Sequence, residues 1–179
     1  MRAIVIYESM YGNTHAVANA IGRGLATGNE VSVVPVADAT PDLLGEADLV
    51  VAGGPTHIHG MSGARSRQAA AEAAHKDGSG LTLEPHVPGP GLRDWFGAVG
   101  HVHGCGAAFD TRMDGPAVLT GRASKAIAKL LDRHGLTEIA AAQSFLVTKD
   151  NQLRPGEEDR AEQWGRELAA KLPAASASR

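Results

Sequence analysis

The chain has 179 residues, of which 43% are hydrophobic, with a formal net charge of -3 and a single cysteine, Cys105. These values predict one globular domain in a reducing compartment, exclude a disulfide within the chain, and argue against nucleic acid as the main partner because no basic surplus exists. The sequence has neither signal-peptide features nor an apolar run near the roughly 20 residues that span a bilayer, so we expect a cytoplasmic protein with no membrane span. We expect one domain over residues 1–172 and a disordered tail over 173–179.

Short apolar runs alternate with segments of helical periodicity along the chain. Unbroken runs such as Val50-Val51 are typical of strands that are buried on both faces of a parallel sheet. Five such strands alternating with helices predict an α/β, doubly wound, three-layer sandwich. The predicted strands are 3–7, 31–36, 49–53, 102–109 and 141–147, and the predicted helical segments are 14–26, 41–44, 62–75, 122–134 and 157–172.

The stretch from His75 to Leu92 interrupts this alternation with many Gly and Pro residues. It is longer than the usual connection in a compact domain. Two interpretations stay open: a tolerated surface insertion, or a functional segment that forms a flap near a ligand or contacts a second subunit. One helical turn is expected at its end, near residues 92–96.

A phosphate site is predicted at the first strand-to-helix junction. Its residues are Ser9, Met10, Tyr11, Gly12, Asn13 and Thr14. Free N–H groups at a helix N-terminus favour an anion, and the Ser, Thr and Asn side chains add uncharged donors. The turn lacks the Lys of a nucleoside-triphosphate loop and the G-x-G-x-x-G of a dinucleotide loop, so a single terminal phosphate fits best.

The pattern Ser-x-x-Gly-Asn-Thr after the first strand resembles the phosphate loop of the flavodoxin family, which binds flavin mononucleotide (FMN). With Tyr11 in place of the family's usual Thr, the loop is also similar to that of quinone oxidoreductases resembling the tryptophan-repressor-binding protein. The resemblance implies a flavodoxin-like fold with strand order 2-1-3-4-5 and a ligand beside strands one and three.

The resemblance implies two further cofactor loops. One comprises Pro55, Thr56, His57, Ile58, His59 and Gly60, which would flank the isoalloxazine ring. Alternatively, His57 and His59 are loop residues that face solvent. The other comprises Phe109, Asp110, Thr111 and Arg112, which would meet the pyrimidine edge.

Arg112 has two interpretations. Near the ring, its charge would stabilise reduced flavin, which is negative near N1 and O2. Alternatively, it forms a salt bridge with Asp110 or Asp114.

A metal site at His101, His103 and Cys105 is not expected, because no fourth ligand is evident nearby. No catalytic nucleophile is needed, since the flavin would carry the chemistry. The leading hypothesis is an FMN-binding carrier of electrons between redox protein partners. The alternatives are an FMN-dependent NAD(P)H:quinone oxidoreductase, which would act on a small quinone-type oxidant, and a flavin-free scaffold. The sequence leaves the partners, the redox potential and the oligomeric state open.

Overall fold

The chain builds a central sheet with helices on both faces, and the computed structural model describes residues 1–57 and 60–172. The predicted tail lies outside the described residues. The strands are β1 (Arg2–Tyr7), β2 (Glu30–Pro35), β3 (Leu49–His57), β4 (Gly60–Met61), β5 (Cys105–Met113), β6 (Thr137–Glu138) and β7 (Gln143–Val147). The helices are α1 (Asn13–Leu25), η1 (Val36–Asp38), α2 (Pro41–Gly45), α3 (Ala64–Ala74), α4 (Leu92–Ala98), α5 (Ala117–Thr120), α6 (Ala123–Arg133) and α7 (Glu157–Lys171).

The strand order is β2-β1-β3-β5, followed by β6 and β7, which both pair with β5. All of these pairs are parallel, so the predicted doubly wound, flavodoxin-like order is confirmed. β6 and β7 lie one after the other along the same side of β5. β6 pairs with Cys105 and Gly106, and β7 begins to pair at Phe109. The chain leaves the sheet between them, because the four residues 139–142 connect β6 to β7 whereas only Ala107 and Ala108 lie between their partners on β5. The sheet therefore has seven strands with β4 included, rather than the five predicted.

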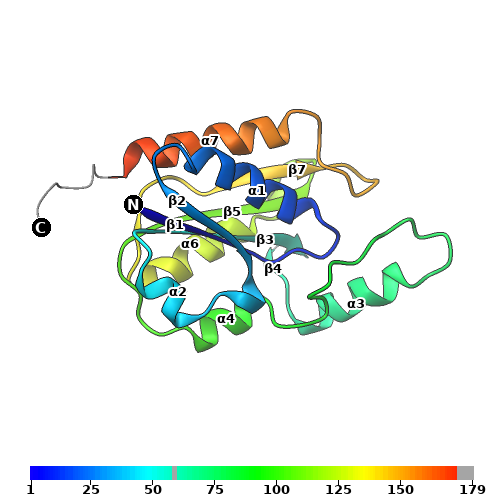
Figure 1. The fold of residues 1–179 in the computed structure, drawn as a ribbon. Coiled ribbons are helices and arrows are strands. Elements are labelled where there is room, and N and C mark those ends of the chain that lie inside the picture. The colour runs from blue at the N-terminus through cyan, green and yellow to red at the C-terminus, as the bar shows by residue number, and fades with distance from the viewer. Residues whose placement is uncertain (58–59, 173–179) are drawn as a thin grey trace, which may run out of the picture.

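Two apolar clusters cover the two faces of the sheet. Figure 1 shows α1 and α7 on one side and α2, α4 and α6 on the other. Val50 packs in the cluster with α4 and α6, and its neighbour Val51 packs in the cluster with α1 and α7. Both side chains are fully buried, because successive residues of a strand point to opposite faces. The double-sided burial predicted from the apolar runs is thus confirmed.

Two strands differ in extent from the prediction. β3 continues past Gly53 to His57, and β5 runs from Cys105 to Met113 instead of 102–109. Gly104 has φ +116, a left-handed conformation that interrupts an extended chain, so β5 begins only after it. Residues 109–112 consequently lie within a strand and alternate between the two faces of the sheet, rather than forming a loop.

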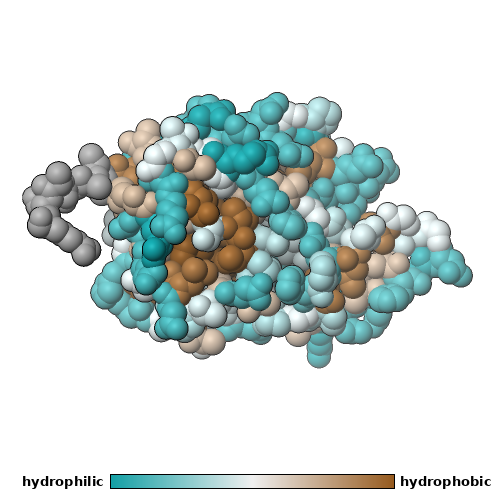
Figure 2. Space-filling model, in the orientation of Figure 1, coloured by the Kyte–Doolittle hydropathy of each residue, from teal (hydrophilic) through white to brown (hydrophobic). Residues whose placement is uncertain are grey.

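Two helices differ from the prediction. α4 is longer than the single turn expected, and the short helix α5 is additional. Figure 2 shows an apolar patch over the edge strand β2, whose residues from Val31 to Pro35 are half-buried. Within residues 1–57 and 60–172, no helix has both the length and the hydrophobicity that crossing a membrane requires.

Candidate functional site

A pocket of about 210 Å³ lies where β1, β3, β5 and β7 reach their carboxyl ends. In a parallel sheet these ends share one edge, and at the switch point beside β1 the crossovers leave to opposite faces and open a crevice. The described residues that line it are Ser9, Met10, Tyr11, Asn13, Thr14, Pro55, Thr56, His57, Thr111, Arg112, Met113, Val147, Thr148, Lys149 and Asn151.

The N-terminus of α1 faces this pocket without a side-chain cap. Gly12 precedes the helix in the left-handed conformation, with φ 92, which a residue bearing a Cβ adopts at a cost. The Ser9 hydroxyl accepts the Gly12 N–H at 3.1 Å and closes the turn. The first N–H groups of the helix have no acceptor within it, so they are available to an anion.

Two side-chain contacts hold the start of α1 against distant segments. The hydroxyl oxygens of Thr14 and Thr111 lie 2.7 Å apart, and the Thr14 side chain is buried. Asn13 donates from Nδ2 to the carbonyl oxygen of Asn151 at 3.0 Å and to its Oδ1 at 3.1 Å. These contacts place hydroxyl and amide groups from α1, β5 and the turn after β7 around one cavity.

The charged residues that line the pocket are cationic, while the Glu84 carboxylate lies beside the phosphate turn without lining the pocket. Arg112 and Lys149 line it, and no carboxylate is found among its described lining residues. His57 adds an imidazole ring to the lining. This set of donors and cations suits an anionic ligand.

A buried polar network supports the chain immediately before the phosphate turn. The Glu8 carboxylate accepts the Leu92 N–H at 2.8 Å and the hydroxyl of Ser62. Arg67, which is buried, pairs with Asp94 at 2.5 Å. The Gly91 N–H, and secondly the Arg67 guanidinium, hold the pKa of the Asp94 carboxyl below its usual value. The network ties α3 and α4 to the end of β1.

The comparisons with known proteins agree with this geometry. Residues 5–88 match the family model described as flavodoxin. A flavodoxin from the domain Archaea has a TM-score of 0.64 and 22% identity, covering 96% of this chain and 99% of that chain. Oxidised flavodoxin 1 from Bacillus cereus has a TM-score of 0.67 and 18% identity, covering 97% of this chain and 100% of that chain. The fold is flavodoxin-like. No curated protein sequence matches it.

Two predicted cofactor residues in this flavodoxin-like fold point away from the pocket. Phe109 is fully buried in the α1–α7 cluster, where its ring meets that of Phe145 edge to face. Asp110 is also fully buried and accepts the Ser124 N–H at 2.7 Å, at the start of α6. Neither residue lines the pocket, because β5 continues through both and directs their side chains into its two covered faces. That the backbone amides of this segment meet the pyrimidine edge of a flavin stays a prediction.

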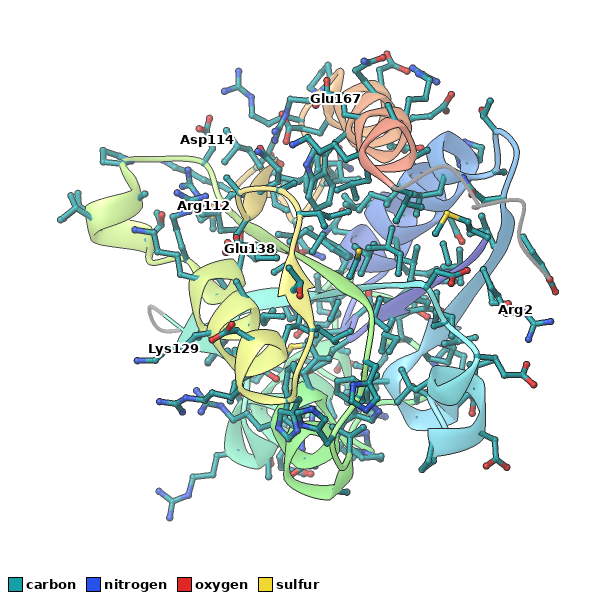
Figure 3. All side chains as sticks on the ribbon, turned by 90° about the vertical axis from the view of Figure 1, so that its left-hand side faces the viewer. Arg2, Arg112, Asp114, Lys129, Glu138 and Glu167 are labelled. Carbon is teal, nitrogen blue, oxygen red and sulfur yellow. The ribbon has the colours of Figure 1, made fainter. Side chains whose placement is uncertain are left out.

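Arg112 does line the pocket, but neither predicted salt bridge forms within the described ranges. Its Nη1 donates to the carbonyl oxygens of Met113 (3.3 Å) and Gly115 (2.8 Å) and to the hydroxyl of Thr120 (2.9 Å). Asp114 instead pairs with Arg154 at 2.7 Å. Figure 3 shows Arg112 and Asp114 beside the loop that carries α5. Arg112 therefore braces this loop.

The second predicted loop is only partly at the pocket. Pro55, Thr56 and His57 line it, and the Thr56 hydroxyl also accepts the Ala123 N–H at 2.9 Å. Gly60 pairs with His57 in the β3–β4 hairpin and is not one of the lining residues. Ile58 and His59 lie outside the described residues.

The long connection before α4 lies against the phosphate turn of this flavodoxin-like fold. Glu84 donates its N–H to the Met10 carbonyl at 2.9 Å, and its carboxylate lies 3.2 Å from Nδ1 of His15. Tyr11 turns toward α3 and donates its hydroxyl to the Ala70 carbonyl at 2.9 Å, and burial raises the pKa of that hydroxyl. This stretch is thus in contact with a segment of the candidate site.

Sequence reasoning overlooked the contribution of the end of β7 and the turn that follows it. Val147, Thr148, Lys149 and Asn151 line the pocket. The available signal was their position directly after the last strand of a parallel sheet, whose carboxyl end shares an edge with the phosphate turn.

Proposed function

We propose that this protein binds FMN in the pocket and carries electrons between redox protein partners. The observation that carries the proposal is the uncapped N-terminus of α1, which opens into a cavity lined by hydroxyl, amide and cationic groups. The absence of carboxylates from its described lining favours a phosphorylated ligand. The flavodoxin-like fold supports FMN as that ligand.

The lining residues fall into two groups according to the elements that carry them. Ser9, Asn13, Thr14 and the first N–H groups of α1 would hold the phosphate. Pro55, Thr56 and His57 on β3, together with Met113 on β5, would border the ring. Bound FMN supplies reversible electron transfer, while the protein provides binding, orientation and electrostatics.

The direct test is a titration of the purified protein with FMN, followed by the quenching of flavin fluorescence. We expect saturable binding at one site, and visible flavin absorbance in protein that retains its cofactor. Correctly folded protein that shows no saturable uptake would overturn the proposal and favour the flavin-free scaffold.

One observation favours NAD(P)H:quinone oxidoreductase as a second candidate. Both tryptophans lie away from the pocket: Trp95 donates its Nε1–H to the Ala39 carbonyl at 3.0 Å, and Trp164 packs near Phe145. No indole therefore covers the ring position, which would leave it open to a small oxidant. Steady NAD(P)H oxidation in the presence of a quinone would support the enzyme. Reduction only through a separate reductase would support the carrier.

A further inference from the structure

The turn after β7 is fastened to the phosphate turn. Asn13 Nδ2 contacts both the carbonyl oxygen and Oδ1 of Asn151, at 3.0 and 3.1 Å. Asn151 has φ 55, and Asn tolerates this left-handed conformation better than most residues. The two turns are 138 residues apart in sequence and adjacent in space.

The same turn is closed by its own hydrogen bonds. Thr148 donates its N–H to the Gln152 carbonyl at 2.7 Å, and Asn151 donates to the Thr148 carbonyl at 3.1 Å. Val147 and Leu153 form an antiparallel bridge at the base. Lys149 lies in this closed turn and lines the pocket, so its backbone is held beside the phosphate turn.

Lys149 differs from Arg112, the other cation that lines the pocket. Arg112 donates from Nη1 to the Gly115 carbonyl and the Thr120 hydroxyl, which braces the α5 loop. Within residues 1–57 and 60–172, no ion pair or hydrogen bond holds the Lys149 ammonium, and its side chain is exposed. Because Lys149 also lines the pocket, its ammonium is available to a ligand there without the loss of an internal contact.

We propose that Lys149 forms an ion pair with the phosphate of the bound flavin and so selects FMN over riboflavin. This inference rests on the proposed function and refines it: the uncharged donors of the first turn are joined by one cation from the last βα junction. A phosphate monoester carries about -1.5 to -2 charges near pH 7, and an ammonium group is a compact point charge that suits it.

The test compares FMN and riboflavin binding in the wild-type protein, in Lys149→Gln and in Lys149→Arg. The matched control is Lys129→Gln, which removes the same charge from the outer surface of α6, where Figure 3 shows Lys129. Fluorescence titrations at low and high salt give each dissociation constant, and circular dichroism confirms that each variant is folded.

We expect Lys149→Gln to weaken FMN binding about tenfold at low salt, as for the loss of one charge-assisted contact. Riboflavin binding should stay unchanged, Lys149→Arg should keep most of the affinity for FMN, and Lys129→Gln should resemble the wild type. High salt should shrink the difference between the wild type and Lys149→Gln.

Equal losses for FMN and riboflavin, or unchanged FMN affinity in Lys149→Gln, would overturn the role of Lys149 while leaving the proposed function standing. Wild-type protein that binds neither flavin would instead overturn the proposed function and this inference with it.

Discussion

The hydroxyl oxygens of Thr14 and Thr111 lie 2.7 Å apart in the lining of the pocket. Thr14 belongs to the first turn of α1, and Thr111 lies on β5, 97 residues later. Both side chains are buried, so each hydroxyl depends on the other for a partner. This contact fixes the position of the α1 N-terminus relative to the central strands.

Thr111→Val should destabilise the protein by about 1–2 kcal/mol, because it leaves the buried Thr14 hydroxyl without its partner. Urea unfolding measures this loss. Thr137→Val on the exposed strand β6 is the matched control and should change stability little. The double variant Thr14→Val/Thr111→Val should lose less unfolding free energy than the sum of the losses in the two single variants. Strict additivity would show that the hydroxyls do not interact.

Gly24→Ala should destabilise the protein by at least about 2 kcal/mol, although Ala is the better helix former. Gly24 lies where α1 crosses α7, and an added Cβ would overlap the Glu162 carbonyl oxygen and crowd the Arg166 nitrogen. Gly97→Ala is the control: it is an exposed helical position in α4 with open space around it, and it should gain roughly 0.5–1 kcal/mol. Chemical denaturation of both variants measures whether the free energy of unfolding falls in Gly24→Ala and rises in Gly97→Ala.

Asp94→Asn should lower stability by about 1 kcal/mol at neutral pH, because the neutral amide loses the charge that pairs with buried Arg67 and strengthens the hydrogen bond from the Gly91 N–H. The pKa of Asp94 is lowered in the fold, so its contribution is present above the unfolded pKa of about 4 and is lost as pH falls through the folded pKa.

The stability difference between wild type and Asp94→Asn should therefore shrink as pH falls below about 4. Unfolding curves recorded from neutral to acidic pH measure it. Asp77→Asn, at an exposed position in the connection after α3, provides a charge-matched control. A difference that grows on acidification would contradict the lowered pKa of Asp94.

Arg112→Lys and Arg112→Ala should both increase proteolytic cleavage within residues 114–121, because neither side chain reproduces the guanidinium contacts to Gly115 and Thr120. If the charge also acts on bound flavin, Arg112→Ala alone should lower the midpoint potential by some tens of millivolts, given that about 30 mV equals 1.4 kcal/mol for two electrons. Limited proteolysis and spectroelectrochemistry separate the two roles. Unchanged cleavage in both variants would rule out the bracing role.

Local patterns were sufficient to predict the layered fold. Val50 and Val51 stand in a run with no polar alternation, and such a run is stable only when both faces of a strand are covered. The turn from Ser9 to Thr14 was likewise readable, because a strand, a Gly and a helix start in this order place N–H groups at one point. Both signals lie within a few consecutive residues.

The amino-acid sequence by itself determined the alternation of the main strands and helices and the polar turn at the head of α1, because backbone conformation and burial pattern are local properties. Only the tertiary structure decided that Phe109 and Asp110 face the packed layers and that Lys149 and Asn151 border the pocket. The first outcome depends on how far β5 extends, which is set by pairing with β3 and β7. The second depends on which strand ends share an edge, and this relationship between segments follows only from the arrangement of the whole sheet.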